Sequence, residues 1–139
     1  MTAHRYRIIK GFISILMIIW IGLSIDSCTI LDSGENRVIS EIYNKQKNKK
    51  VILFIKGGNA TVDNSFQLMI SKADYKLNNK DVGNVFVVDS NHNNAVIDSV
   101  CVTASWISND SIMIGYDKRL RTFRKDSVFD NVKIIYKEK

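Results

Sequence analysis

Apolar and polar residues alternate with a period of two in several short stretches of this 139-residue chain, and no other feature constrains its fold as much. Residues 66–70 alternate in this way, and the pattern recurs at 100–106, 112–116 and 132–136. Successive side chains of a β-strand point to opposite faces of the sheet. The alternation therefore predicts strands that are buried on one face.

Two short runs are apolar throughout, at Val51–Ile55 and Val85–Val88, which indicates strands covered on both faces. Asn109 and Asp110 separate two alternating stretches. They predict a tight β-hairpin, because both residue types tolerate the left-handed backbone of such turns. Together the segments predict an all-β domain of roughly seven strands, mainly antiparallel, arranged as a sandwich or as one strongly bent sheet.

One segment has a second interpretation. Ile39 and Ile42 have helical spacing, and Asp32 with Glu35 resembles the capping box that begins a helix. A short helix near 35–46 is therefore an alternative to a first strand in this part of the chain.

A hydrophobic leader precedes the β-rich part. Arg5, Arg7 and Lys10 are followed by Phe12–Ile25, an uncharged apolar run of 14 residues. A basic start and a short apolar run are typical of a secretory signal peptide, whereas a membrane-spanning helix needs about 20 apolar residues. We therefore expect a helical leader that directs export and leaves the rest of the chain on the outer side of the membrane.

The apolar run ends in Ile25, Asp26, Ser27 and Cys28, which resemble a bacterial lipobox. The aliphatic Ile25 and the small Ser27 match that motif, whereas Asp26 stands where a small uncharged residue is usual. The resemblance implies cleavage before Cys28, alkylation of its sulfur with diacylglycerol, such as one carrying palmitate, and acylation of the freed amine. Two or three acyl chains hold a protein on a membrane where one chain does not.

Cleavage there divides the chain into a signal peptide, a tether and one β-rich domain, at residues 1–27, 28–36 and 37–139. Two other interpretations of Cys28 stay open, an incidental thiol beside an uncleaved anchor and a disulfide with Cys101. Apolar residues flank Cys101 on both sides, and no base that would activate it is evident. We expect a small buried side chain at Cys101, not a nucleophile.

A family resemblance lies in three stretches, "VILFIKGGNATVDNSFQLMIS", "GNVFVVDS" and "ASWISNDSIMIGYDKRLRTFRKDSVFDNVKIIYK". The chain from about Val38 to Lys137 resembles a family of small uncharacterised bacterial envelope proteins that share a Gly-Ala-Thr loop, an "NVF" strand and a tryptophan hairpin. Asn59 is inserted before the alanine-threonine pair, and glycine stands where relatives commonly have cysteine. No role of that thiol is carried over, and the resemblance implies a fold and a location but no activity.

The most specific of these blocks contains the loop "KGGNATVDNS", which is a candidate ligand-binding surface. Paired glycines allow a close backbone approach or a positive φ, and their N–H groups can form an anion-binding nest. The candidate residues are Lys56, Gly57, Gly58, Asn59, Thr61 and Asp63. The alternative is structural: the glycines let the chain turn, while Asn59, Asp63 and Asn64 bond their own backbone.

Groups suited to catalysis are sparse. His92 is the only histidine outside the leader, and no G-x-S-x-G elbow, phosphate loop or dinucleotide fingerprint is present. An enzyme would have to use His92, or an acidic pair such as Asp63 and Asp89 that folding brings together. One histidine and one buried cysteine cannot supply the ligands of a zinc site. The sequence predicts no catalytic residue and no cofactor.

The segment around His92 also has a calcium-like pattern. Asp89, Asn91 and Asn93 alternate as EF-hand ligands do, but Asn94 stands where glycine is needed and Val100 where glutamate is needed. We therefore interpret the segment as a polar surface turn and predict no metal site.

The formal net charge is +6, and basic residues cluster at Lys45–Lys50 and Lys118–Lys125. Phe123 is the one aromatic residue in the two clusters, fewer than the stacking aromatics expected of a nucleic-acid site, so we expect no nucleic-acid partner. The sequence predicts a noncatalytic β-domain of the cell envelope, not cytoplasmic, held on the outer or plasma membrane as a lipoprotein. Its partners are membrane lipid through Cys28 and an envelope protein or cell-wall component. The alternative is a membrane-anchored or secreted enzyme, hydrolase-like but of unrecognised type.

Overall fold

The apolar run at 51–55 forms strand β2 (Lys49–Lys56), which pairs antiparallel with β1 (Asn36–Tyr43) on one side and with β3 (Ser65–Lys72) on the other. The computed structural model of the protein describes residues 34–58, 62–96, 98 and 100–139. The leader and the lipobox-like site lie outside the described residues, so the expectations for them stay predictions.

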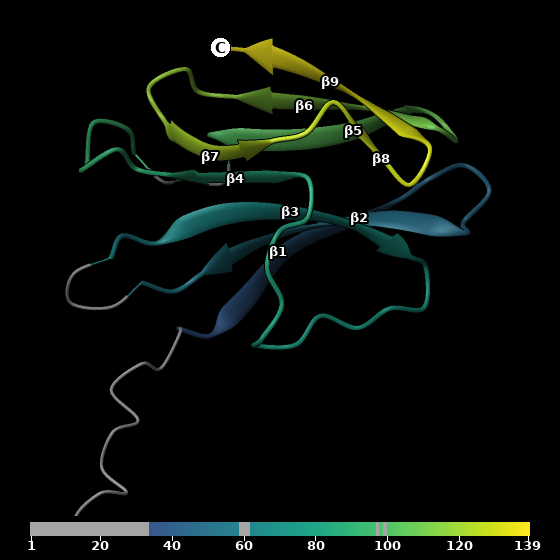
Figure 1. Ribbon diagram of the computed structural model, residues 1–139, viewed down its shortest axis with the longest axis horizontal. Helices are drawn as coiled ribbons and strands as arrows, with labels where there is room; N and C mark the ends of the chain where they lie inside the picture. Colours follow the sequence, from purple (N-terminus) through teal and green to yellow (C-terminus); the bar gives the residue numbers. More distant parts are fainter. Residues whose placement is uncertain (1–33, 59–61, 97, 99) are drawn as a thin grey trace, which may run out of the picture. The chain divides into compact units, whose positions relative to one another are not determined.

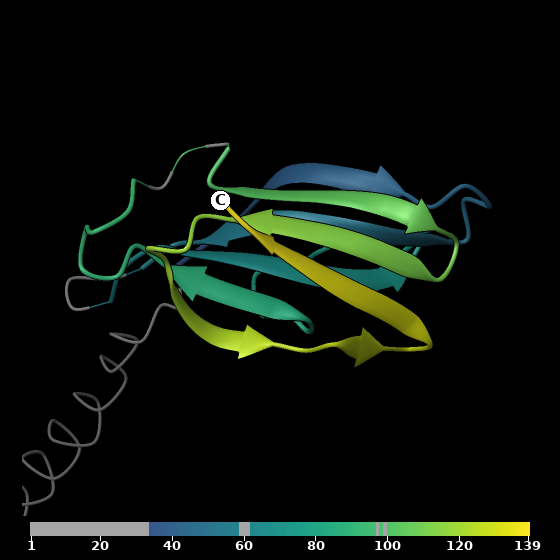
Figure 2. The same cartoon turned by 90° about the horizontal axis from the view of Figure 1, so that it is seen from above.

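The described residues contain nine strands in two sheets that pack face to face (Figures 1 and 2). One sheet has the order β1-β2-β3-β4-β7, in which β4 is Phe86–Asp89 and β7 is Arg121–Lys125. The other has the order β5-β6-β9-β8, with the bounds Val102–Ser108, Ser111–Tyr116, Val132–Glu138 and Val128–Phe129. The pairing is antiparallel except between β6 and β9. The predicted all-β fold, mainly antiparallel, is confirmed.

Strands β7 and β8 were not expected from the apolar pattern. Every residue of β7 is exposed, and β8 has only two residues, so neither shows an alternation of apolar and polar side chains. β7 belongs to its sheet through its register with β4, in which Asp89 pairs with Arg121 and Phe86 with Lys125. Much of the basic cluster at 118–125 is therefore an edge strand.

The alternative of a helix near 35–46 is wrong, because this segment forms β1. The register with β2 shifts between Val38, which pairs with Phe54, and Ser40, which pairs with Leu53. Such a bulge adds one residue to the strand, here Ile39, and interrupts the period of two. The extra residue explains the three-residue interval between Ile39 and Ile42 that had suggested a helix.

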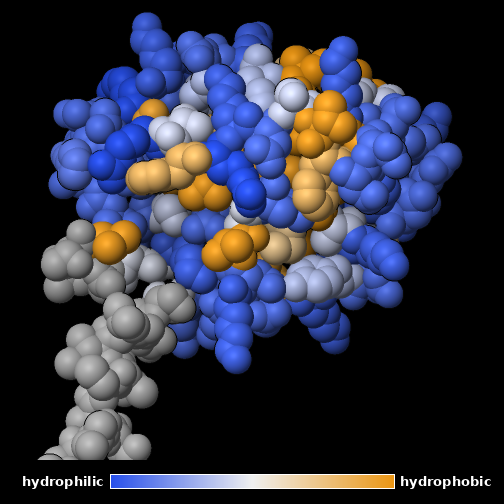
Figure 3. Space-filling model, viewed as in Figure 1, coloured by the Kyte–Doolittle hydropathy of each residue, from blue (hydrophilic) through white to orange (hydrophobic). Residues whose placement is uncertain are grey.

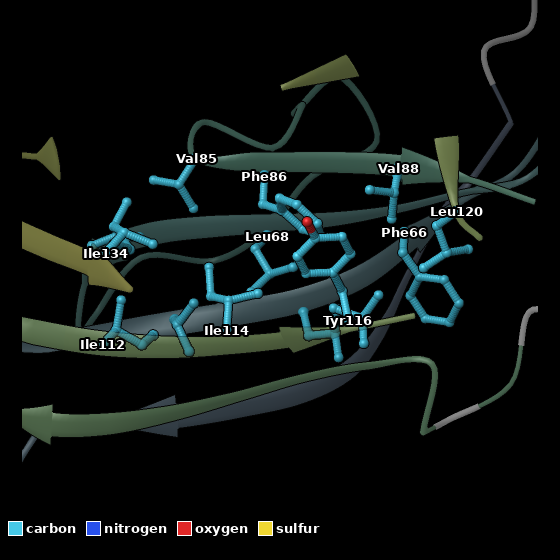
Figure 4. Close-up of a cluster of buried hydrophobic side chains, with 14 of the residues drawn as sticks. Phe66, Leu68, Val85, Phe86, Val88, Ile112, Ile114, Tyr116, Leu120 and Ile134 are labelled. Carbon is cyan, nitrogen blue, oxygen red and sulfur yellow. The ribbon is translucent and has the colours of Figure 1, made fainter. Parts of the chain in front are cut away.

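The core lies between the two sheets, where large side chains from both are fully buried (Figure 4). The five-stranded sheet contributes Phe66, Leu68 and Phe86, and the ring of Phe86 lies 5.2 Å from that of Tyr116 and 5.4 Å from that of Tyr136. Each large apolar side chain buried in this way stabilises the fold by about 1.5–3 kcal/mol. The apolar positions of the alternating pattern, such as Phe66 and Leu68, are thus the side chains that face the core.

A second, smaller cluster covers the outer face of β2 and β3. Ile52, Phe54 and Met69 are buried there against Leu77, which comes from the long connection between β3 and β4. Asn36 donates from Nδ2 to the backbone carbonyls of Asn78 and Asp81 and so holds this connection against the sheet. The expectation that the apolar run of β2 is covered on both faces is confirmed.

Two tight turns differ from each other in backbone conformation. Asn109 and Asp110 join β5 and β6 as predicted, but neither has a positive φ, so the reason given for that turn was wrong. The register between β5 and β6 shifts by one residue between Trp106 and Ser108, which alters the geometry that the turn must close. The left-handed pair is instead Asp130 and Asn131, with φ of 46° and 60°, between β8 and β9.

The surface seen in Figure 1 is mostly hydrophilic, and apolar side chains gather on it in a few separate patches (Figure 3). The side chains more than half exposed include Val62, Val96, Val100, Ile107 and Phe123. Three of them, the valines, belong to connections between strands and not to a sheet face.

We expect Phe86→Ala to lower the free energy of unfolding by about 3–5 kcal/mol, because it removes a fully buried ring from the packed core. Chemical denaturation at neutral pH measures the change. Phe123→Ala is the matched control, since this ring is 60% exposed, and its expected effect is within about 1 kcal/mol. Equal losses in the two variants would contradict the assignment of the core.

Candidate functional site

The predicted ligand loop begins where β2 ends, and its first residues are engaged within the protein. Lys56 Nζ donates to the carbonyl oxygens of Asn79 and Asp81, at 3.2 and 3.1 Å. The N–H of Gly58 donates to Oδ1 of Asn64 at 2.8 Å. Lys56 and the Gly58 N–H therefore bond partners inside the protein.

Close packing requires glycine at position 58 and leaves little room for a Cβ at position 57, and neither glycine has a positive φ. A Cβ added to Gly58 would lie 1.8 Å from the carbonyl oxygen of Val62, and one added to Gly57 would lie 3.3 Å from Cα of Gly34. These contacts support the structural interpretation of the glycines. Asn59 and Thr61 lie outside the described residues, so their role stays a prediction.

Asp63, the last residue of the predicted set, lines a pocket of about 370 Å³ that we call the Arg121 pocket. Phe66 and Val88 point into the core, so Ser65, Val87 and Asp89 beside them point to the outer face of the five-stranded sheet. The pocket lies on this face and is lined by Val62, Asp63, Ser65, Val87, Asp89, His92, Arg121 and Phe123.

A salt bridge between neighbouring strands forms one wall of the pocket. Asp89 and Arg121 occupy paired positions of β4 and β7. Arg121 donates from Nε to Oδ1 of Asp89 at 3.2 Å and from Nη2 to Oδ2, so the contact is bidentate. The Asp89 side chain is 5% exposed and that of Arg121 is 41% exposed, so the pair joins a buried anion to a half-exposed cation.

The environment of Asp89 favours its charged form. Burial acts to raise the pKa of this carboxyl group, but the hydrogen bonds from Arg121 and from the N–H of Asn91 outweigh burial and hold the pKa below its ordinary value of 3.8. Asp89 is therefore a structural anion at neutral pH. It is not a proton donor or acceptor.

A strained turn follows Asp89 and carries His92 into the pocket. Asn91, His92 and Asn93 all have left-handed backbones, with φ of 53°, 57° and 67°. Such a conformation costs roughly 1–2 kcal/mol per residue, least for asparagine. Ser90 anchors the turn, because its hydroxyl accepts the N–H of Asn93 and its carbonyl accepts the N–H of Ala95.

The orientation of His92 defines its tautomer. Its Nε2 lies 3.2 Å from Nη1 of Arg121, and a guanidinium group can only donate hydrogen bonds. Nε2 is therefore the acceptor, and the neutral ring carries its proton on Nδ1. His92 and Asp89 together hold Arg121 from two sides.

The other polar wall joins two connections of the sandwich. The Ser90 hydroxyl donates to Oδ2 of Asp63 at 2.7 Å, and this contact links the turn at 90–95 to the loop before β3. The pair is oriented by the protein before any ligand arrives.

Phe123 forms the apolar side of the pocket. The register between β4 and β7 shifts between Val87, which pairs with Arg124, and Val88, which pairs with Thr122, so Phe123 is the extra residue of a bulge. Its ring is 60% exposed and lies 4.8 Å from the guanidinium carbon of Arg121.

The sequence named His92, or alternatively an acidic pair of Asp63 and Asp89 brought together by folding, as the groups that an enzyme would have to use, and all three line this pocket. It missed Arg121 and Phe123, which lie about thirty residues beyond Asp89 and His92. The available signal was the basic cluster at 118–125, but nothing in that cluster indicated which strand it would join.

Cys101 lies apart from this pocket, whereas the calcium-like pattern of Asp89, Asn91 and Asn93 coincides with the turn that carries His92 into it. Cys101 is a buried thiol beside a second pocket, and burial raises its pKa. Cys28 lies outside the described residues, so a disulfide between the two stays a prediction. The described part of the chain contains no cluster of three or more His, Cys, Asp and Glu side chains placed to hold a metal ion.

Two substitutions at position 92 separate the strain of the turn from the role of its side chain. His92→Gly and His92→Val both remove the imidazole, but only glycine adopts a left-handed backbone without strain. We expect the valine variant to be less stable than the glycine variant by at least about 1 kcal/mol in denaturant unfolding. Equal stabilities would show that the turn relaxes to an ordinary backbone.

The pH dependence of stability tests the Asp89 salt bridge. Because folding lowers the pKa of Asp89, its contribution is complete above 3.8 and is lost as the pH falls through the folded-state value. Asp89→Asn should lower the free energy of unfolding at neutral pH by about 1–3 kcal/mol. This loss is smaller than the cost of breaking a fully buried pair, because Arg121 is half exposed. Its stability should also fall less steeply than that of the wild type in acid.

The matched control for this measurement is Asp126→Asn, which removes an exposed ion pair with Arg124 of 3.6 Å. We expect its effect at neutral pH to stay within about 0.5 kcal/mol. A loss of stability for Asp126→Asn as large as that for Asp89→Asn would contradict the assignment of Asp89 as the structural anion.

Comparison of the chain with protein-family models, with curated proteins and with solved structures found no match. The resemblance to small envelope proteins therefore remains an expectation from the sequence, and the function has to be argued from the site itself.

Proposed function

We propose that this chain is an exported lipoprotein, held on a membrane of the cell envelope by an acylated Cys28, and that its β-sandwich is a noncatalytic binding domain. The Arg121 pocket is the binding site in this proposal. Its ligand is a component of the envelope, either part of a protein or part of the cell wall.

The observation that carries the binding role is the state of the polar groups around the pocket. Asp89 is held by Arg121, and Asp63 is held by the hydroxyl of Ser90. Apolar surface from Val62 and Phe123 lies beside them. A few fixed polar groups next to exposed apolar surface are typical of a preformed ligand site.

A hydrolase is the second candidate, because Asp63 and His92 line one pocket and the Ser90 hydroxyl bonds Asp63 beside it. Two observations rank it lower. Ser90 is only 5% exposed, and Nε2 of His92 faces Arg121. A nucleophile has to reach its substrate, and a general base has to reach the proton that it removes. Ser90 is too buried to reach a substrate, and Nε2 of His92 is engaged by Arg121. The geometry therefore favours binding over hydrolysis.

The membrane role rests on the charged start, the apolar run and the lipobox-like end of the leader. Among the described residues, no helix is long and apolar enough to cross a membrane. An attachment that precedes β1 would be needed, and acylation of Cys28 would supply it.

Metabolic labelling tests the attachment. The full chain is expressed in a bacterium that processes lipoproteins, in the presence of labelled palmitate, beside Cys28→Ala and Cys101→Ala. We expect label and a shortened mass for the wild type and for Cys101→Ala, and no label for Cys28→Ala. Cys101→Ala is the control because it also removes one thiol, from a position inside the domain.

Two outcomes would contradict lipidation in different ways. Unlabelled full-length protein in the membrane would show that Phe12–Ile25 remains as an uncleaved anchor. A shortened, unlabelled product in the medium would show a secreted domain and would make a disulfide between Cys28 and Cys101 the next question.

A further inference from the structure

We propose that the ligand of the Arg121 pocket is a neutral, hydroxyl-rich saccharide, whose hydroxyl groups bond Asp63, His92 and Arg121 and whose C–H face packs on Phe123. This inference rests on the proposed binding role of the pocket and names the chemistry of its ligand.

The charges of the pocket disfavour a charged ligand. An anion would be repelled by the carboxylates of Asp63 and Asp89, which both line the pocket, and would compete with the buried Asp89 for Arg121. A cation would bind at Asp63, but Arg121 lines the same pocket and would repel it. A neutral ligand avoids both repulsions.

The same groups offer donors and acceptors to a neutral polar ligand. Arg121 has five N–H groups, and three of them bond Asp89 and His92 among the described residues. With Nε2 of His92 accepting from Arg121, its Nδ1 keeps a proton to donate. Asp63 accepts one hydrogen bond from Ser90, and a carboxylate has room for more. A hydroxyl group both donates and accepts, so neighbouring hydroxyl groups suit this mixed set.

The apolar side of the pocket suits the ring of a sugar. Phe123 and Val62 are 60% and 59% exposed at its rim. A pyranose ring presents C–H groups on its face and hydroxyl groups at its edge, so the face can pack on an aromatic ring while the edge bonds polar groups. The volume of about 370 Å³ lies at the small end of ligand sites and fits one or two such rings.

The strained turn accounts for the fixed position of the donors. Three consecutive left-handed residues are costly, and strain of this kind persists where the surrounding structure supports it, often at binding sites. Here the support comes from Asp89 and Ser90, which accept the N–H groups of Asn91 and Asn93. His92 is thereby held against Arg121 before a ligand binds, which reduces the ordering cost of binding.

Saturation-transfer NMR on the full chain in detergent tests the proposal, because it detects weak binding from the signals of the small molecule. The probes are glucose, N-acetylglucosamine and a disaccharide of each at millimolar concentrations, with acetate, methyl phosphate and ethylamine as charged comparators. The variants are Phe123→Ala, Phe123→Tyr and Tyr43→Ala, which removes an exposed aromatic ring from β1, away from the pocket.

We expect at least one sugar to receive saturation, strongest at its ring C–H protons. Its affinity should fall about tenfold or more in Phe123→Ala and stay within about twofold of the wild type in the other two variants. Retention in Phe123→Tyr separates the loss of the ring from a loss of folding.

Three results would overturn the proposal. Sugar saturation that is unchanged in Phe123→Ala would place the sugar elsewhere. Saturation of a charged comparator but of no sugar, lost in Phe123→Ala, would reject the saccharide and keep the pocket as a binding site. Saturation of no probe would reject the saccharide together with the cell-wall form of the proposed binding role.

Discussion

The antiparallel pairing of β4 with β7 is the contact on which both the sandwich and the pocket depend. After β6 the chain leaves the four-stranded sheet, contributes β7 to the other sheet, and returns to form β8 and β9. At one end of the pair Arg121 meets Asp89 in the pocket. At the other end Lys125 donates to the Tyr116 hydroxyl at 2.6 Å and lies over the ring of Tyr136, both in the four-stranded sheet. One exposed strand thus connects the two sheets and completes the site.

Most of the strands could be predicted because the spacing of their apolar side chains indicates which face is buried. Phe66, Leu68 and Ile70 are buried as their alternation predicts, and the unbroken run of β2 is buried as well. Gln67 and Met69 are also buried, so the prediction that β3 is buried on one face only was wrong. β7 has no such pattern, because all of its residues are exposed. β1 was ambiguous because a bulge at Ile39 changed the spacing of its apolar residues. Local pattern therefore predicts burial well and edge pairing poorly.

The same reasoning explains which site residues could be found. Asp63, Asp89 and His92 were named because few groups suited to catalysis exist in the chain. Arg121 and Phe123 join them only through the β4–β7 register and the bulge within it. A register between strands about thirty residues apart depends on how the whole sheet assembles, and a single sequence carries no local signal for it.

The two left-handed segments show how differently this backbone conformation is used. Asp130 and Asn131 close a two-residue hairpin, where such residues are common and the conformation matches the twist of the strands. Histidine adopts the same conformation less readily than asparagine. His92 nevertheless has it, between two asparagines on the turn that faces Arg121. The first segment serves chain reversal, and the second fixes a side chain in the pocket.

The position of the chain ends has a practical consequence. Strand β1 begins at Asn36, which pairs with Lys56, and the C-terminal residue Lys139 bonds Tyr116. Both residues lie on the side of the sandwich where β4 meets the Arg121 pocket (Figure 1). A support attached through the C-terminus would crowd the pocket, whereas the turn at Asn109–Asp110 is at the opposite end of the sandwich. For a chain anchored at Cys28, the eight residues before Asn36 reach at most about 28 Å. A domain tethered in this way can reach only ligands close to the membrane surface that holds it.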